Sequence, residues 1–277
     1  MTSTGHNAVQ VLEDRADLQR ARLLQSILPV PRPLEDGSEL PFLSHWCQFH
    51  QAVALADVGP DGHPKVGDFI PDTGLPRRMW AGSRVEFLAP LHAGAALRKV
   101  SSVKAITPKE GRSGKLCFVT VSHEINADGV LCIREEQDLV YREAARGPAA
   151  GKPEWMEAPQ GAQFSETVRP DPVMLFRYSA LTFNSHRIHY DRNHSVETEG
   201  HGGLVVHGPL IATLLVDLLG RNASWHPLRS FCFKAVSPLY DTSPFEISGR
   251  MEDDGAILWA HSGTGGLAME ARVEFAC

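Results

Sequence analysis

Residues 202–219 read GGLVVHGPLIATLLVDLL, and this stretch decides the fold. The pair Gly208-Pro209 suits the start of a helix, because proline at the first helical position loses no needed hydrogen bond and glycine permits close backbone approach. Residues 210–219 are apolar apart from one threonine and one aspartate, which predicts a helix that is surrounded by protein on every face. We therefore expect a fold built around a buried central helix.

The start of this helix is a predicted site for a polarised oxygen atom. The first N–H groups of a helix have no acceptor within the helix, and they stabilise negative charge. A thioester oxygen that becomes negative in an enolate-like transition state is a suitable acceptor for the N–H groups of Gly208 and Leu210, with His207 beside them. The alternative is a core helix whose first turn is capped by an upstream carbonyl or by water.

A second informative stretch, residues 176–191, reads FRYSALTFNSHRIHYD and lies a short distance before the helix. One of its histidines could act as a general base, because an imidazole titrates near neutral pH. The five histidines between residues 186 and 207 also raise the possibility of a metal site, but no Cys or Glu accompanies them at ligand spacing, and we expect no metal. A serine hydrolase is disfavoured because the chain has no GxSxG elbow.

Composition restricts the classes of partner. The chain has 277 residues, 43% of them hydrophobic, which is enough for a substantial core in one large domain or two ordinary ones. A formal charge of −6 and a pI near 6.1 do not favour nucleic acid as a partner. The sequence has no apolar run near the roughly 20 residues that span a bilayer and no signal-peptide pattern, so no membrane association and a cytoplasmic location are expected.

The cysteines do not indicate a disulfide framework. They are dispersed, odd in number and without a CxxC pair, which also disfavours a thiolate zinc site. We expect them to be small buried residues. The five are Cys47, Cys117, Cys132, Cys232 and Cys277.

The rest of the chain predicts an α+β fold. Residues 8–28 have apolar residues at helical spacing and are expected to form an amphipathic helix that stops at Pro29. Alternating apolar residues predict strands between residues 80 and 141, with a turn at Asp128-Gly129, and again in the last third, with a turn at Asp254-Gly255. The expected strands are VEFLAPL, LCFVTVSHEI and VLCIREEQDLVY, then FCFKAVSPLY, FEISGRM, AILWAHS and LAMEARVEF.

The two parts share features that are consistent with a duplicated unit. A strand ends in Pro-Leu in each, at Pro90-Leu91 and at Pro238-Leu239, and a Gly-, Pro- and Ala-rich linker lies near residues 145–155. This predicts an N-terminal unit over residues 1–145 and a C-terminal unit over residues 156–277. The first unit has no counterpart of the apolar helix, so we expect it to have lost its site and to serve as a lid or wall.

These motifs resemble a known family. The segment YSALTFNSHRIHYD is similar to the signature of MaoC-like (R)-specific enoyl-CoA hydratases, and GGLVVHGPLIATLL is similar to their central helix. Four further segments, GLPRRMWAGSRVEF, GRSGKLCFVTVSHEI, EEQDLVYR and LFRYSALTFNSHRIHYDR, resemble the fused double hot-dog subfamily of mesaconyl-CoA and itaconyl-CoA hydratases. The similarity covers roughly residues 40–277. It implies two hot-dog units, each an antiparallel sheet wrapped around a central helix, with the first unit degenerate. The signature residues in register are Tyr178, Ala180, Leu181, Ile188, His189 and Asp191.

The resemblance also implies site residues. His189 takes the position of the catalytic histidine, and Gly208 that of the oxyanion contact. Asn184 stands where the family has its catalytic Asp. Because an amide cannot accept a proton as a carboxylate does, we expect His189 to carry the acid–base work and Asn184 to orient the water. In the rival interpretation the missing charge comes from Asp191, or from a carboxylate of the first unit such as Asp57 or Asp68.

The expected reaction is reversible addition of water across the α,β double bond of a branched C5 dicarboxylyl-CoA, mesaconyl-CoA or itaconyl-CoA, giving citramalyl-CoA. The substrate is an acyl-CoA thioester, no metal or redox cofactor is required, and a homo-oligomer, with a dimer favoured, is expected. The distal carboxylate needs a cation in the pocket. Residues considered for substrate binding are Arg77, Arg78, Trp80, Arg187 and Arg192, although any one of these arginines could instead be ordinary surface charge or hold the CoA phosphates.

Three other activities remain open from the sequence. The first is a straight-chain enoyl-CoA or acyl-carrier-protein dehydratase, which would need no buried arginine. The second is a hot-dog thioesterase, in which water attacks the carbonyl carbon and free CoA is released. The third is a non-catalytic acyl-CoA sensor, because the family's Asp is missing.

Overall fold

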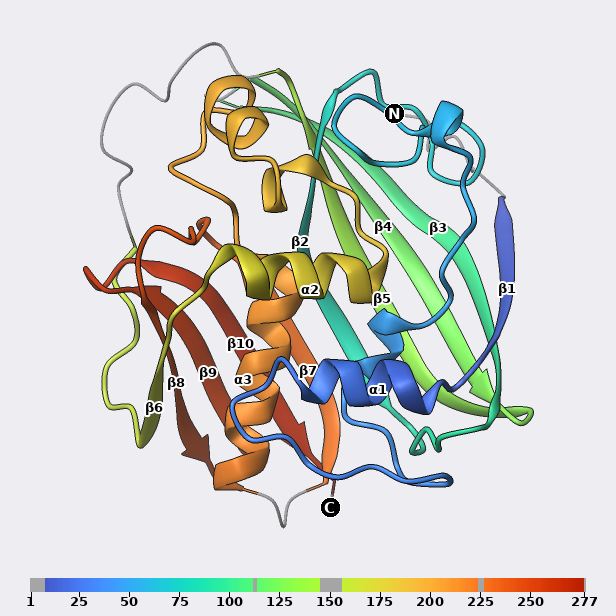
Figure 1. The fold of residues 1–277 in the computed structure, drawn as a ribbon, viewed down its shortest axis with the longest axis vertical. Helices are drawn as coiled ribbons and strands as arrows, with labels where there is room; N and C mark the ends of the chain where they lie inside the picture. Colours follow the sequence, from blue (N-terminus) through green and yellow to red (C-terminus); the bar gives the residue numbers. More distant parts are fainter. Residues whose placement is uncertain (1–7, 112–113, 145–155, 224–226, 277) are drawn as a thin grey trace.

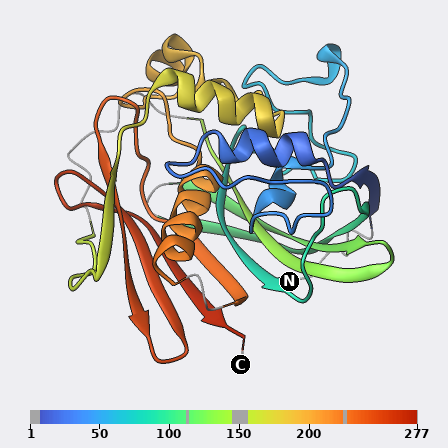
Figure 2. The same ribbon diagram turned by 60° about the horizontal axis from the view of Figure 1, so that its bottom comes forward.

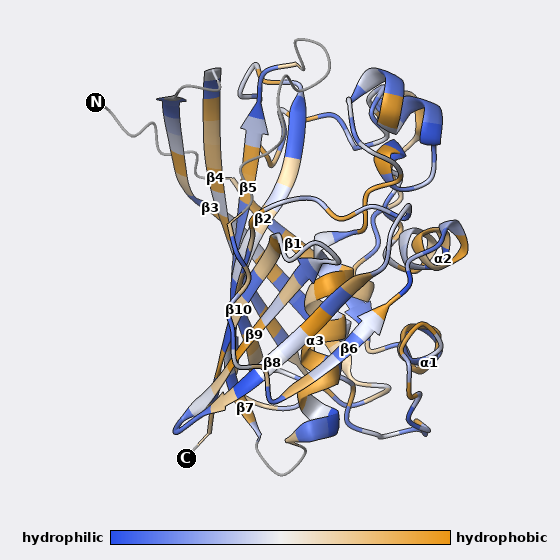
Figure 3. Ribbon diagram, turned by 90° about the vertical axis from the view of Figure 1, so that its left-hand side faces the viewer, coloured by the Kyte–Doolittle hydropathy of each residue, from blue (hydrophilic) through white to orange (hydrophobic). Residues whose placement is uncertain are grey.

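One antiparallel sheet of ten strands forms the scaffold within residues 8–111, 114–144, 156–223 and 227–276, which the computed structural model describes. Helices α1, α2 and α3 all lie on one side of it (Figures 1 and 3). The strands of the first half are β1 (Val9–Arg15), β2 (Arg77–Phe87), β3 (Ala96–Gly111), β4 (Gly114–Ala127) and β5 (Val130–Arg142). Those of the second half are β6 (Phe164–Val168), β7 (Leu228–Ala235), β8 (Phe245–Glu252), β9 (Gly255–Ser262) and β10 (Leu267–Phe275).

The order of the strands is symmetric about the middle of the sheet. It runs β1-β3-β4-β5-β2-β7-β10-β9-β8-β6, so each strand of the first half has an equivalent in the second at the same distance from the centre. The central pair, β2 and β7, joins the halves, with Gly82 opposite Lys234 and Glu86 opposite Ser230. The five-and-five division agrees with a duplicated unit, while the predicted linker at 145–155 falls outside the described residues.

The central helix predicted from residues 202–219 is confirmed as α3 (Gly208–Asn222). It packs against β6, β8, β9 and β10, and Figures 2 and 3 show it between the sheet and the other two helices. Two polar side chains within its apolar stretch have partners in the helix: the Thr213 hydroxyl donates to the Pro209 carbonyl, and Asp217 pairs with Arg221. These two polar side chains therefore do not oppose the burial of the helix.

The described part of the first half has no helix comparable to α3. Its only α-helix is α1 (Leu18–Gln25), and the short 3-10 helix η1 (Ser44–Cys47) packs against α1 and α2. Two η1 side chains, His45 and Trp46, bond to the buried carboxylate of Glu135 on β5 at 3.0 and 3.1 Å. The inner face of this half is thus filled by short segments and side chains, as expected for a degenerate unit.

The prediction of one helix over residues 8–28 is wrong. Residues 9–15 form β1, which pairs with β3 at an edge of the sheet, and only Leu18–Gln25 is helical. Asp17 separates the two, because its side chain accepts the N–H of Arg20 and so caps the helix. The helical spacing of apolar residues extends over both the strand and the helix, which is why a single helix was predicted. Strand β3 was not predicted from the sequence.

The remaining expectations from composition can be compared with the described residues. No helix among them is long and apolar enough to cross a membrane. Cys47, Cys117 and Cys132 are buried, as expected, but Cys232 on β7 is exposed, which corrects the expectation for that residue. All four are free thiols, and Cys277 lies outside the described residues.

Candidate active site

The loop after α2 (Pro172–Thr182) carries the predicted catalytic residues. The helix ends at Phe183, whose φ of 50° is left-handed and turns the chain. Next, Asn184 fixes the loop: its Oδ1 accepts the backbone N–H of His186 at 3.0 Å, and its own N–H donates to the Ser179 carbonyl at 2.8 Å. The Asn184 side-chain oxygen therefore shapes the loop, and its amide N–H₂ is the part left to orient a ligand.

His189, at the end of the short helix η3 (Arg187–His189), is held in one tautomer. Its Nδ1 lies 2.7 Å from the carbonyl oxygen of Val205, which can only accept, so Nδ1 carries the hydrogen and Nε2 has a free lone pair. Burial lowers the pKa of His189 to about 4, so the ring is neutral at pH 7. A neutral imidazole with a free Nε2 is the form that accepts a proton from water.

His207, the residue before α3, stacks on His189. The two ring centroids are 3.6 Å apart with an interplanar angle of 17°, and the His207 Nε2 lies 2.8 Å from the Ser179 hydroxyl. Its Nδ1 is buried and has no hydrogen-bond partner among the described residues. Burial, followed by the neighbouring histidines, holds the pKa of His207 well below its usual range. His207 thus connects the predicted base to the start of the helix.

The first turn of α3 has free donors beside this pair. Ile211 donates its N–H to the His207 carbonyl, whereas the N–H groups of Gly208 and Leu210 have no acceptor in the described chain. Met269 and the backbone oxygen of Trp80 on β2 are the nearest groups to a Cβ built on Gly208, both at 3.9 Å. The predicted oxyanion site therefore lies where the two halves meet.

Two residues beside the predicted base that the sequence did not single out, Asp61 and His63, come from a loop of the first half. The His63 Nδ1 donates to the Asp61 carboxylate at 2.8 Å, and the His63 ring lies 4.1 Å from the ring of His186. His186 in turn meets His189 edge to face, at 5.5 Å between centroids. A row of four imidazoles, His63, His186, His189 and His207, thus runs to the start of α3.

Among the described residues, Asp61 has the only carboxylate that is hydrogen-bonded to one of these four rings. Asp57 and Asp68, considered from sequence, are both exposed, and Asp191 pairs with Arg187 instead. Asp61, His63 and His186 offer one potential metal ligand atom each within 4.8 Å of one another.

The sequence signal for this loop was the segment GPDGHP at residues 59–64, in which Gly and Pro indicate only a turn.

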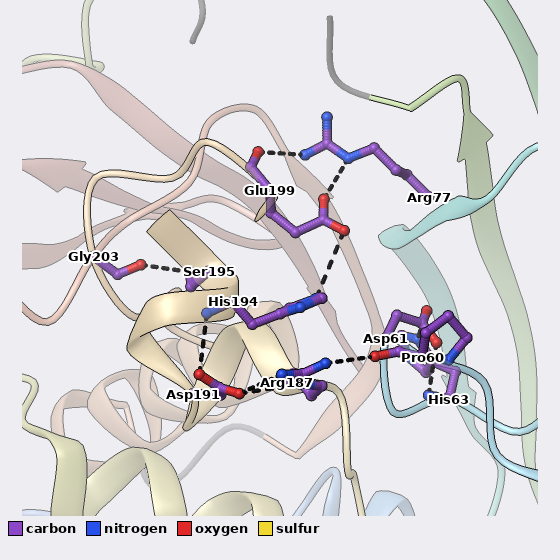
Figure 4. A network of polar contacts seen from close by, with 10 residues as sticks. All are labelled: Pro60, Asp61, His63, Arg77, Arg187, Asp191, His194, Ser195, Glu199 and Gly203. Carbon is purple, nitrogen blue, oxygen red and sulfur yellow. Dashed lines mark hydrogen bonds and ion pairs between the residues drawn. The ribbon is translucent and has the colours of Figure 1, made fainter. Parts of the chain in front are cut away.

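Contacts across the halves hold this loop in place. Arg187 bonds through its side chain to the Pro60 carbonyl at 3.0 Å and through its backbone N–H to the Asp61 carbonyl at 2.9 Å. A Cβ at Gly62 would lie 1.8 Å from the Ser185 oxygen, so only glycine allows this approach. Figure 4 shows the network, in which Glu199 lies between Arg77 and His194.

The candidate arginines differ in their partners. Arg77 pairs with Glu199 at 2.5 Å, Arg187 with Asp191 at 2.7 Å, and Arg192 with Asp241. Arg78 is half-buried and has no carboxylate partner among the described residues. Its charge lowers the pKa of His63, after burial, and contributes to the lowered pKa of His186. Of the four candidate arginines, Arg78 is therefore the one that acts electrostatically on His63 and His186 and has no carboxylate partner among the described residues.

Trp80, two residues further along β2, lines the same junction. Its ring packs against Trp46 at 5.1 Å and Phe233 at 6.3 Å, and its Nε1 donates to the Ser83 hydroxyl at 3.0 Å. The aromatic cluster closes the space between the first half and the start of α3. It is a wall of the candidate site.

Asn184→Asp tests whether the amide is needed. A carboxylate can still accept the N–H of His186, so we expect the loop to keep its shape and activity to persist or rise if Asn184 only orients water. The variant should be compared with the unmodified protein by initial rate and thermal unfolding. A fall to the level of a His189→Ala variant, with an unchanged unfolding temperature, would show that a second negative charge is harmful here.

Comparisons with known proteins agree with this architecture. The profile of the family "Hydroxyacyl-thioester dehydratase type 2" matches residues 43–241. A "Mesaconyl-C(4)-CoA hydratase" of Chloroflexus aurantiacus is 43% identical over 265 residues, which cover 95% of this chain and 94% of that protein.

Solved structures support the fold. A MaoC-like dehydratase from Phytophthora capsici superposes with a TM-score of 0.68 at 13% identity, covering 98% of this chain and 96% of that one. A Mycobacterium tuberculosis protein described as having a double hotdog fold gives 0.58 at 12% identity, covering 99% and 96%. The double hot-dog fold implied by the sequence is thereby confirmed.

Proposed function

Because the chain belongs to the hydroxyacyl-thioester dehydratase type 2 family and is a hydro-lyase, we propose that it adds water reversibly to a branched C5 dicarboxylyl-CoA, giving citramalyl-CoA. The relative from Chloroflexus aurantiacus carries the name of such a substrate, mesaconyl-C(4)-CoA. In that thioester the free carboxylate is attached to the β-carbon, which is also the carbon that water attacks. Itaconyl-CoA, whose double bond runs from the same carbon to a methylene group, is the second candidate, and with it the proton would go to that methylene carbon instead of the α-carbon.

The observation that carries the proposal is the position of His189 beside the start of α3. Its Nε2 has a free lone pair because Nδ1 is bonded to Val205, and it is stacked on His207, the residue that precedes the free N–H groups of Gly208 and Leu210. His189 accepts a proton from water while the oxygen bonds to the β-carbon. The electrons of the double bond move toward the thioester oxygen, which the two N–H groups stabilise, and the α-carbon then takes a proton.

Arg78 is the residue proposed to bind the substrate carboxylate. A carboxylate on the β-carbon must lie close to the base, and Arg78 acts on His63 and His186 while lacking a carboxylate partner in the described residues. Tyr141 lies opposite Arg78 in the β2–β5 pair; burial raises the pKa of its hydroxyl, and the Arg78 guanidinium opposes that rise. A guanidinium and a neighbouring hydroxyl could together bind a buried carboxylate.

A single assay separates the candidate activities. Mesaconyl-, itaconyl- and crotonyl-CoA are followed both for enoyl absorbance and for free thiol. We expect loss of the mesaconyl-CoA absorbance without thiol release. Faster turnover of crotonyl-CoA would indicate a straight-chain hydratase, free thiol would indicate a thioesterase, and CoA binding without either signal would indicate a sensor. Hydration is redox-neutral, so the proposal includes no redox cofactor, and coenzyme A enters as part of the substrate.

Gly208→Ala tests the backbone contact with the thioester. The new methyl group would meet Met269 and the Trp80 oxygen only at van der Waals distance, and Gly208 has no left-handed φ, so the free protein should fold normally and gain slightly in helix propensity. We nevertheless expect kcat/KM to fall by about tenfold or more, because the methyl group occupies the approach of the thioester oxygen. Unchanged kcat/KM in a stably folded variant would place the thioester elsewhere. Gly220→Ala, near the other end of the helix, is the matched control.

A further inference from the structure

The double hot-dog site lacks the family's catalytic carboxylate, and the first half supplies another one. Asp61 is half-buried and accepts two hydrogen bonds from His63, one from its ring at 2.8 Å and one from its backbone N–H at 3.0 Å. Burial alone would raise the pKa of Asp61, but the contacts with His63 hold it well below its usual range, so this carboxylate is ionised. An ionised acceptor at Nδ1 leaves the lone pair of His63 on Nε2.

The pair is fixed against the catalytic loop. Gly62 and Ser185 touch through their backbones, the Ser185 hydroxyl donates to the Gly62 carbonyl, and Arg187 bonds to the carbonyls of Pro60 and Asp61. These contacts place a histidine of the first half in ring contact with His186, the neighbour of the predicted base.

We infer that His63 is a second catalytic acid–base residue of this site, held and charge-balanced by Asp61, and that it transfers the proton of the α-carbon while His189 transfers that of water. The inference rests on the proposed hydration reaction. It assigns a catalytic residue to the half of the protein that the sequence predicts to be degenerate.

The step balances in both directions. In dehydration, His63 Nε2 takes the α-proton, the C–H electrons form the enolate, and the C–O bond at the β-carbon breaks as the leaving oxygen receives a proton from His189. In hydration, protonated His63 gives its proton to the α-carbon after water has lost one to His189. Solvent water returns both residues to their starting forms.

The charges around His63 allow its ring both to gain and to lose a proton. Burial and the nearby Arg78 lower the pKa of His63, whereas Asp61 and Glu199 raise it. A substrate carboxylate bound by Arg78 would neutralise that cation and favour the imidazolium form. Protonation is thus coupled to the presence of the substrate.

An exchange experiment tests α-proton transfer without water addition. Methylsuccinyl-C(4)-CoA, the saturated analogue of the proposed substrate, cannot be dehydrated, but its α-hydrogens can exchange with D₂O. We expect the unmodified protein to catalyse this exchange, His63→Gln to slow it by about 100-fold, and His189→Asn to retain most of it while losing hydration. Asp61→Asn should lower kcat more than it changes KM, with partial recovery in Asp61→Glu. Asp57→Asn, an exposed carboxylate near the same loop, is the control.

Several results would overturn the inference. Exchange that survives in His63→Gln but is lost in His189→Asn would mean that His189 handles both protons. Absence of exchange in the unmodified protein would also refute it. A stoichiometric bound metal whose removal by a chelator stops exchange would make Asp61, His63 and His186 a metal site instead. Exchange that depends on His63, in a protein that hydrates none of the tested thioesters, would support the inference and refute the proposed function.

Discussion

His189→Ala is expected to lower kcat for hydration by about 100- to 10,000-fold, the usual contribution of a general acid–base group, while CoA binding changes little. The His189 Nε2 is the lone pair that the bond from Nδ1 to Val205 leaves free. Because burial lowers the pKa of His189 to about 4, the neutral base is present throughout the neutral range, and activity should fall as the pH is lowered through that value.

Two variants make this test specific. Removing the ring leaves a gap against His207, 3.6 Å away, so a structural loss must be distinguished from a catalytic one. His189→Asn retains an amide donor for Val205 but no base, and should be as inactive as the alanine variant with a smaller loss of stability. His92→Ala, on the surface, should behave as the unmodified protein. More than half of the activity remaining in both His189 variants would refute the assignment.

The central helix and the catalytic loop could be predicted because their signals are local. A long, almost wholly apolar segment after Gly208-Pro209 predicts a buried helix, and residues 176–191 combine a helix pattern with a motif shared by a family. The paired strands around the turns Asp128-Gly129 and Asp254-Gly255 were equally readable. In the region 8–28, by contrast, two short elements lie so close together that one helical period fits both.

The place of Asp61 and His63 beside the predicted base could not be predicted, because it depends on a contact distant in sequence. His63 meets His186 across 123 positions, and only the pairing of β2 with β7 and the docking of the loop on Ser185 and Arg187 bring them together. The choice between Arg77 and Arg78 had the same difficulty. Neighbouring residues of a strand face opposite sides, and a sequence does not show which side faces the site.

Arg78→Ala is expected to lower kcat/KM for a C5 dicarboxylyl-CoA by about 10- to 1,000-fold, as for the loss of one to a few kcal/mol from a charge-assisted bond, while crotonyl-CoA turnover changes far less. An unpaired carboxylate is costly to bury, so the substrate that has one should depend most on this cation. Arg78→Lys should recover part of the loss, because lysine keeps the charge but not the two-pronged geometry.

The neighbouring arginine provides the control. Arg77 already pairs with Glu199, so Arg77→Ala should affect both thioesters alike through the inter-half network, whereas Arg78→Ala should discriminate between them. Removing Arg78 should also let the pKa of His63 rise, which would extend the protonated form of that ring to higher pH in crotonyl-CoA assays.

Equal losses on both substrates would assign Arg78 to CoA binding or folding. Efficient crotonyl-CoA hydration by the unmodified protein, at rates matching mesaconyl-CoA, would remove the need for a carboxylate-binding residue altogether.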